Sequence, residues 1–275
     1  MTIGSPAKIN WFLYVLGKRD DGFHDILSTV QRVSLFDEIE LNPSKNISLN
    51  SSSNIPDNII LKVIERLTKE RGYKGDGIDI SLRKNIPLSA GLGGGSSNAA
   101  EMIRALNNEW KLGLSNDELL RIAAELGSDI PFFVSERFCV MKGRGERIEY
   151  IDKSVSYDIL LVNPGVPVSA GWAYRNNLDY IEIEERAVLD KFDKAYRKRD
   201  FERLREVMIN SLEGPVFRRY PVVEGIKGQM LDTGARIALM SGSGSTVFGV
   251  FESKEDAERA RGKFKGYWTS VVSTI

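Results

Sequence analysis

The sequence predicts an α+β protein of two domains, residues 1–154 and 155–275. Its 275 residues are enough for two domains, because single domains usually run to ~100–200 residues. Strand patterns occur in the first half, at residues 5–16 and 26–44, where β-branched, aromatic and apolar side chains predominate. Residues 181–232 carry charged, amphipathic helix patterns instead, of the kind that covers a sheet.

The composition is that of a soluble globular protein that must handle anions locally. Hydrophobic residues make up 42% and charged residues 28%, and Lys plus Arg equals Asp plus Glu at 38 each, so the overall charge favours neither nucleic acid nor a membrane surface. Cys139 is the only cysteine, which excludes an intrachain disulfide and favours a reducing compartment. Lys8 and Asn10 interrupt the apolar N-terminal stretch, and no run approaches the ~18 apolar residues of a membrane span. We therefore expect a cytoplasmic protein without a nucleic-acid or membrane partner.

The first strand pattern contains two polar residues that need an explanation. Lys8 and Asn10 lie two apart and so face the same side of a strand, where burial would be costly without a polar partner. An exposed edge strand would explain them without any function. A turn at residues 17–22 (GKRDDG) follows, and then Phe23 and His24, the only histidine.

Three further elements are expected before the glycine-rich segment. Residues 46–54 are mostly Ser and Asn and predict a polar turn or loop. Residues 56–70 have apolar side chains at helical spacing, with Asp57 as the N-cap and Asn58 at the start of the helix. Residues 78–88 (IDISLRKNIPL) predict a strand that leads into the glycine-rich segment.

Residues 87–97 (PLSAGLGGGSS) predict a binding loop for phosphate. Ser96 or Ser97 is expected to be the N-cap of a helix whose apolar positions continue to Trp110. A glycine loop that enters a helix N-terminus offers backbone N–H groups and the positive end of the helix dipole to an anion. Positive φ angles and close approach of a ligand are expected at four positions, Gly91, Gly93, Gly94 and Gly95.

The two best-known phosphate-binding motifs do not account for this loop. The pattern GxxxxGK[ST] is absent from the chain, which excludes a Walker-type loop. The spacing of Gly91, Gly93 and Ser96 approaches the dinucleotide fingerprint, but the following segment predicts another helix instead of a strand with an acidic end. A flexible surface loop before a capped helix is the functionless alternative.

One acidic residue stands out in the segments that follow the helix predicted after the glycine loop. Gly113 is expected to stop that helix, and Ser115 with Glu118 forms a capping box for a second helix that ends at Gly127. Asp129 follows, directly before the apolar run Ile-Pro-Phe-Phe. An aspartate in this place is often only a cap or a turn residue.

Strands and helices alternate in the remainder of the chain. Residues 138–151 predict a hairpin that turns at Gly143 to Gly145. Residues 157–176 predict a buried strand, then a Pro/Gly-rich segment and a helix. Residues 238–251 (ALMSGSGSTVFGVF) place a second glycine-serine turn between two apolar runs, and residues 255–275 predict a helix and a last strand.

Three segments, in order along the chain, resemble the motifs of the GHMP kinase superfamily. They are PAKIN with GKRDDGFH, the loop PLSAGLGGGSS, and SGSGST; GSDIPF resembles a further recurrent segment. The resemblance implies a two-domain fold, with an N-terminal domain like domain 2 of ribosomal protein S5 and a C-terminal ferredoxin-like α/β sandwich. It also implies transfer of a phosphoryl group from ATP to an alcohol in a cleft between the domains.

The first segment is most similar to the branch of the superfamily that acts in the non-mevalonate isoprenoid pathway. That similarity implies a small-molecule substrate, diphosphocytidyl-methylerythritol, phosphorylated on its 2-hydroxyl. By the same resemblance Phe23 and Tyr174 would sandwich the cytosine, and His24 would read the base edge. Many members carry tyrosine in place of Phe23, so any hydrogen bond from that hydroxyl is lost here. The remaining implied substrate contacts are Asn10, Gly242 and Ser243.

The resemblance also assigns the catalytic and ATP-binding residues. Asp129 would orient the hydroxyl and take its proton, while Lys8 would stabilise the developing charge. Mg²⁺ is expected with ATP, and Ser97 is its expected side-chain ligand. The protein would be a monomer or a weak homodimer. The implied ATP-binding residues are Pro87, Leu88, Ser89, Ala90, Gly91, Leu92, Gly93, Gly94, Gly95, Ser96 and Ser97, with Asn58 near the adenine.

Two other functions stay open at this point. One is a GHMP kinase for a small alcohol such as homoserine or mevalonate, which would have no base for Phe23 to stack on. The other is a module that binds cytidine nucleotides without catalysis, which would not need both Lys8 and Asp129.

Overall fold

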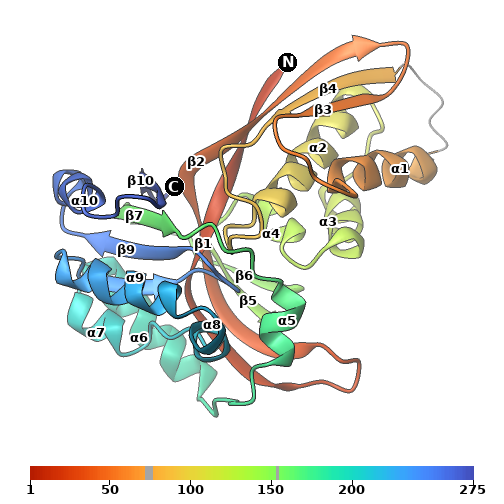
Figure 1. Cartoon of the computed structure of the whole chain (residues 1–275). Helices are drawn as coiled ribbons and strands as arrows, with labels where there is room; N and C mark the ends of the chain where they lie inside the picture. Colours follow the sequence, from red (N-terminus) through yellow and green to blue (C-terminus); the bar gives the residue numbers. More distant parts are fainter. Residues whose placement is uncertain (72–76, 153–154) are drawn as a thin grey trace. The chain divides into compact units, whose positions relative to one another are not determined.

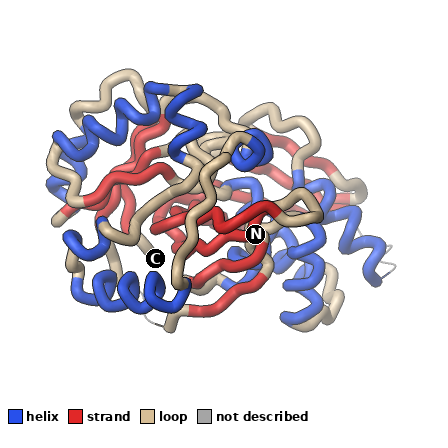
Figure 2. The backbone as a smooth tube through the Cα atoms, turned by 90° about the horizontal axis from the view of Figure 1, so that it is seen from below, coloured by secondary structure: helices blue, strands red, loops and turns tan. Residues whose placement is uncertain are grey.

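The computed structural model describes residues 1–71, 77–152 and 155–275 (Figure 1). The chain forms two compact units that are interleaved in the sequence, and each contains both helices and strands. Figure 2 shows the helices and strands along the backbone. Strands β1 (Thr2–Lys18) and β2 (His24–Ser44) contribute residues to both units. The predicted boundary between residues 154 and 155 begins in a segment outside the described residues, so it stays a prediction. The first unit comprises Met1–Ala7, Leu35–Ile86 and Gly93–Arg137, and the second Lys8–Ser34, Pro87–Leu92 and Phe138–Ile275.

The sheet of the first unit includes a strand that the sequence analysis missed. The second half of β2 pairs antiparallel with β4 (Gly77–Arg83), and β3 (Ser48–Ser51) pairs parallel with β4. Strand β3 lies within the tract 46–54, for which a turn or loop was the expectation, and that expectation is wrong. Its Ser and Asn residues have low strand propensity, but pairing with β4 satisfies their backbone groups and outweighs propensity.

Helix α1 (Ile59–Arg71) confirms the predicted amphipathic helix, with Ile60, Val63 and Leu67 buried. Its cap differs from the expected one. Asp57 has a left-handed backbone (φ 52°), and the side chain of Asn58 caps the helix instead, because its Oδ1 accepts a hydrogen bond from Ile60 N at 3.1 Å. Propensity alone does not separate these residues, since Asp and Asn cap helices about equally well.

Helices α2 (Gly94–Glu109) and α3 (Asn116–Leu126) follow the predicted pattern closely. The apolar positions of α2 are buried, and the capping box of Ser115 and Glu118 and the C-cap at Gly127 are confirmed. Helix α2 ends four residues before Gly113, because the chain already turns at Lys111 (φ 51°). A short helix, α4 (Ile130–Ser135), completes the first unit.

The second unit contains an antiparallel sheet with the strand order β10-β7-β9-β8. Its strands are β7 (Asp158–Asn163), β8 (Ile237–Met240), β9 (Val247–Phe251) and β10 (Trp268–Ser273). The first half of β2 pairs with β5 (Cys139–Gly143), which forms the predicted hairpin with β6 (Arg147–Tyr150). The strands predicted on either side of the glycine-serine turn are β8 and β9.

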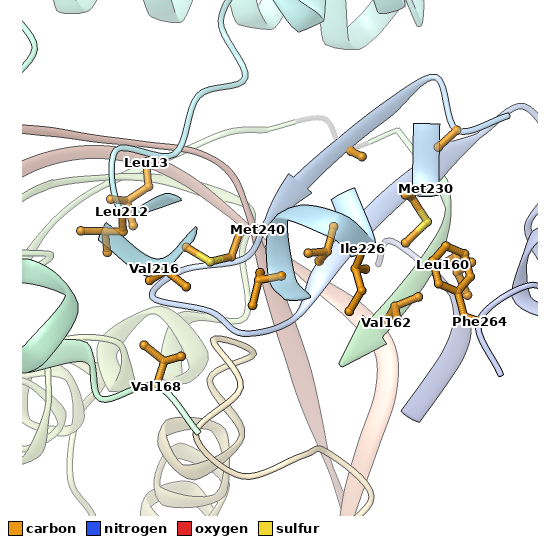
Figure 3. Packing of buried hydrophobic residues seen from close by; sticks show 14 of the residues in the cluster. Leu13, Leu160, Val162, Val168, Leu212, Val216, Ile226, Met230, Met240 and Phe264 are labelled. Atoms are coloured by element: carbon orange, nitrogen blue, oxygen red, sulfur yellow. The ribbon is translucent and has the colours of Figure 1, made fainter. Parts of the chain in front are cut away.

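Helices and a continuous apolar core support this sheet. Met240 of β8 and Ile226 and Met230 of α9 pack in the same cluster as Leu160 and Val162 of β7 (Figure 3). Within the described residues, no helix has the length and apolar character needed to cross a membrane. The helices are α5 (Ala170–Arg175), α6 (Glu185–Lys198), α7 (Phe201–Arg205), α8 (Glu213–Arg219), α9 (Pro221–Asp232) and α10 (Lys254–Arg261).

Candidate functional site

Helix α2 begins at a glycine and not at a serine. Its N-cap is Gly93, with φ 69° and ψ 14°, and Ser96 and Ser97 lie in the first turn, so the predicted serine cap is wrong. The chain must adopt a left-handed conformation before the helix, which glycine adopts without strain. Of the loop glycines, Gly91 (φ 77°) and Gly93 have positive φ, whereas the expectation of positive φ fails for Gly94 and Gly95, which begin the helix.

The start of α2 is open where an anion would bind. The backbone N–H groups of a first helical turn have no partner within the helix, and Gly93 has no side chain to cap them. Gly95 is exposed, and a side-chain carbon added there would meet none of the described atoms within 4 Å. The geometry therefore suits a phosphate group next to these amides.

Ser97 lies deeper than the glycines of the loop. Its Oγ is buried and accepts a hydrogen bond from Ser5 Oγ at 2.8 Å. Ligation of Mg²⁺ by Ser97 stays a prediction. The described residues contain no cluster of three or more His, Cys, Asp or Glu side chains that could hold a metal.

A buried ion pair that the sequence analysis missed braces both ends of the glycine loop. Asp37 pairs with Lys84, and the two side chains are 0% and 4% exposed. Asp37 Oδ1 accepts hydrogen bonds from Asn85 N at 2.8 Å and Ile86 N at 2.9 Å, just before the loop. Its Oδ2 accepts a hydrogen bond from Asn98 Nδ2 at 3.0 Å, just after the loop. One carboxylate thus fixes the chain on both sides of the predicted phosphate-binding residues.

Replacing Asp37 by asparagine is expected to lower the free energy of unfolding by ~3–5 kcal/mol, because it leaves the buried ammonium of Lys84 without its counter-charge. Urea unfolding of the purified variant measures this change. The matched control is Glu38→Gln, since Glu38 is 49% exposed and lies 3.6 Å from Arg83. The control should change stability by less than ~1 kcal/mol. Equal effects of the two substitutions would contradict the proposed bracing role.

Lys8 and Asn10 are buried partners on β1. The ammonium of Lys8 donates a hydrogen bond to Asn10 Oδ1, and Asn10 Nδ2 donates to Ser28 Oγ at 2.8 Å. Both side chains are at most 5% exposed, so the alternative of an exposed edge strand is wrong. The backbone N of Lys8 also donates to Leu92 O at 3.0 Å, which ties β1 to the glycine loop.

The second glycine-serine turn meets the first loop beside Lys8. Ser241 Oγ donates a hydrogen bond to Gly91 O at 3.0 Å. A side-chain carbon added at Gly242 would lie 3.0 Å from Gly91 O, 3.0 Å from Lys8 Nζ and 3.3 Å from Asn10 Oδ1. Ser243 is the partly exposed residue of this turn. Three segments that are distant in the sequence therefore converge on the Lys8 ammonium.

Asp129 lies in the first unit, at the N-cap position of α4. Its side chain is partly exposed, and among the described residues it makes no capping hydrogen bond to α4. Capping therefore does not account for this aspartate. That Asp129 and Lys8 act at one hydroxyl stays a prediction.

The residues predicted to bind the base lie in the second unit. The rings of His24 and Tyr174 are stacked, with centroids 5.4 Å apart and planes at 28°. Phe23 is 48% exposed, and the guanidinium of Arg144 lies 5.0 Å from its ring centroid. A base between Phe23 and Tyr174 would have to displace His24 or use the other face of Tyr174, so the sandwich stays a prediction. Burial, aided by the charge of Lys18, lowers the pKa of His24.

Comparison with known proteins gives consistent matches over the whole chain. Residues 58–137 match the family model for the GHMP kinases N terminal domain, and residues 192–269 match that for the GHMP kinases C terminal. The 4-diphosphocytidyl-2-C-methyl-D-erythritol kinase of Thermodesulfovibrio yellowstonii is 39% identical, with 100% of this chain and 98% of that protein covered. The enzyme of the same name from Geobacter sulfurreducens is 38% identical, with coverage of 100% and 99%.

Solved structures agree with these sequence matches. A crystal structure of 4-(cytidine 5'-diphospho)-2C-methyl-D-erythritol kinase superimposes with a TM-score of 0.85 at 30% identity and covers 99% of both chains. The homoserine kinase of Cytophaga hutchinsonii superimposes with a TM-score of 0.74 at 19% identity, covering 100% of this chain and 94% of that one. The latter likeness concerns the fold alone.

Proposed function

Because this chain belongs to the GHMP kinase family, we propose that it transfers the γ-phosphoryl group of ATP to the 2-hydroxyl of 4-diphosphocytidyl-2-C-methyl-D-erythritol. The products would be the 2-phosphate and ADP, in the non-mevalonate route to isoprenoid precursors. The observation that carries the proposal is the convergence of Gly91 and Gly242 on the Lys8 ammonium, since it joins three of the family motifs at one charge.

The glycine loop would hold the phosphates of ATP. Phosphoryl transfer needs positioning and charge neutralisation more than covalent help from the protein. The amides at the start of α2, which no side chain of the N-cap residue caps, and the positive end of the helix dipole supply fixed partial charges for this purpose. Asn58 stays the residue proposed to lie near the adenine, although its side chain also caps α1.

Lys8 and Asp129 would carry the chemistry at the hydroxyl. The hydroxyl oxygen attacks the γ-phosphorus, the bond to the β-phosphate oxygen breaks, and ADP leaves. Asp129 would orient the hydroxyl and accept its proton, and Lys8 would stabilise the negative charge that develops during transfer. Asn10 supports this role of Lys8, since its Oδ1 fixes the direction of the ammonium. Mg²⁺ would accompany ATP and neutralise phosphate charge, and we assign no further step to it.

The predicted stacking of cytosine on two aromatic rings can be tested by substitution. We expect Tyr174→Ala and Phe23→Ala each to weaken binding of the cytidine substrate by ~1–3 kcal/mol, the usual contribution of a base stacked on an aromatic ring. Isothermal titration calorimetry with the substrate alone measures this loss. Tyr150→Phe, which changes an exposed tyrosine of β6, is the control and should leave the affinity unchanged. Wild-type affinity in both alanine variants would remove the cytosine sandwich from the proposal.

One assay decides between the proposed function and its two alternatives. The protein is incubated with Mg-ATP and, in turn, with diphosphocytidyl-methylerythritol, homoserine and mevalonate, and the release of ADP is followed. Release that requires the cytidine compound supports the proposal. Release with homoserine or mevalonate would identify a kinase for small alcohols. Binding of the cytidine compound without any ADP release would identify a non-catalytic binding module.

We further propose that the protein works in the cytoplasm, as a monomer or a weak homodimer. Cys139 is the only cysteine of the chain, so it forms no intrachain disulfide, which supports a reducing compartment.

A further inference from the structure

Loop 241–246, between β8 and β9, depends on side chains for its position. Gly242 (φ 55°) and Gly244 (φ 84°) both adopt left-handed conformations, and glycine loses more conformational freedom on folding than other residues. The loop nevertheless comes close to the Lys8 ammonium, because a side-chain carbon at Gly242 would lie 3.0 Å from it. A loop of this kind needs hydrogen bonds from outside to keep such a distance constant.

Asn210 supplies two of these hydrogen bonds from a segment outside the motifs singled out in the sequence analysis. Its side chain is 3% exposed, and its Nδ2 donates to Met240 O at 2.7 Å and to Gly242 O at 2.8 Å. Its Oδ1 accepts from Leu212 N at 2.9 Å. The side-chain amide of Asn210 thus donates two hydrogen bonds and accepts one, each with a different backbone group, and these three bonds fix its orientation.

The same segment is joined to the strand that carries Lys8. Leu13 N donates to Ile209 O at 2.7 Å, and Ser211 N donates to Leu13 O at 2.8 Å. Asn210 lies between these two bonds and forms a parallel bridge with Leu13. Asn210 therefore links β1, five residues after Lys8, to the carbonyl of Gly242.

A carboxylate that is only 14% exposed, that of Glu213, supports the residue before the loop. Glu213 accepts a hydrogen bond from Met240 N at 2.9 Å and pairs with Lys227 at 2.7 Å. Burial raises the pKa of Glu213, while Lys227 and the bond from Met240 act in the opposite direction. Glu213 thus holds the residue before the loop, and Asn210 holds the loop itself.

We propose that Asn210 is a positioning residue that sets the place of Gly242 against the ammonium of Lys8. This inference rests on the proposed function, in which Lys8 stabilises charge during phosphoryl transfer. A displacement of about 1 Å at a reacting group can lower a rate by ~10²-fold. An aspartate at position 210 would turn a carboxylate oxygen toward two carbonyl oxygens and push the loop away, and an alanine would leave both carbonyls without their donor.

Steady-state kinetics test the effect on catalysis. Asn210→Ala and Asn210→Asp should lower kcat by about tenfold or more, while KM for ATP stays within about threefold of the wild-type value. Asn107→Ala is the matched control, because Asn107 also bonds the backbone of a connecting segment, through Leu114 N at 2.9 Å and Leu114 O at 3.3 Å. It should lower the melting temperature without lowering kcat. If kcat falls in all three variants in proportion to their loss of stability, Asn210 has no positioning role.

Hydrogen exchange gives a second readout that does not depend on turnover. In the wild type, Ser241 N, Gly244 N and Thr246 N donate to backbone carbonyls at 2.9, 2.9 and 3.2 Å, so we expect their exchange to be slow. Peptides that cover residues 239–247 should exchange faster in Asn210→Ala than in the wild type, and peptides from α10 should not. Unchanged exchange in 239–247 would overturn the inference. A wild type without turnover would refute the proposed function instead, and the exchange rates would still decide whether Asn210 holds the loop.

Discussion

Asp129→Asn is expected to lower kcat by ~10²-fold or more while ATP still binds with nearly its wild-type affinity. The substitution keeps the size of the side chain but removes the group proposed to accept the proton of the hydroxyl. The start of α2, where ATP phosphates are proposed to bind, is not altered. Single-turnover phosphoryl transfer measures the rate, and titration with a fluorescent ATP analogue measures the affinity.

The control for this substitution is a second aspartate of the first unit. Asp117 lies in the first turn of α3 and is exposed, so Asp117→Asn should change only the helix-dipole interaction, by ~0.3–1 kcal/mol of stability. Its turnover should equal that of the wild type. Near-normal turnover of Asp129→Asn would remove this carboxylate from the proposed chemistry, whatever the control does.

Gly91→Ala is expected to abolish measurable kinase activity and to destabilise the protein. A side-chain carbon at this position would lie 2.0 Å from Ser241 O and 2.9 Å from Gly244 N, which are backbone atoms that cannot move without moving the whole turn. The φ angle of 77° adds backbone strain for any residue with a side chain. Thermal unfolding and the ADP-release assay measure the two effects.

The control for Gly91→Ala is the same substitution at another glycine of the second unit, where no loss of activity is expected. Gly228 lies in α9, where an added carbon would meet none of the described atoms within 4 Å. Gly228→Ala should stabilise the helix by ~0.5–1 kcal/mol and leave activity intact. Wild-type activity in Gly91→Ala would mean that the two glycine loops do not have to touch for catalysis.

Local patterns in the sequence were enough to predict most elements and the motif residues. The capping box at Ser115, the buried face of α2 and the two strands around SGSGST depend on residues that are near each other in the chain. The errors concern features that local residue preferences do not decide. Pairing with β4 makes β3 a strand, and the turn before α2 selects Gly93 as its cap over the two serines.

The buried polar contacts were beyond prediction from the sequence for the same reason. Nothing near Asp37 indicates that its carboxylate binds Lys84 and both ends of a loop some fifty residues away. In the sequence, Asn210 is an ordinary asparagine before a helix. Its hydrogen bonds to Met240 O and Gly242 O are visible only in the structure.

By itself, the sequence determined the kinds of chemistry that are available: a glycine-rich helix start for phosphate, a lysine on a strand, and an aspartate before an apolar run. Only the tertiary structure shows that Gly242 lies next to Gly91 and Lys8, and that buried side chains such as Asn210 hold it in that position. The physical reason is that hydrogen bonds and ion pairs depend on distances in space, which the folding of the whole chain sets and which local residue preferences do not encode.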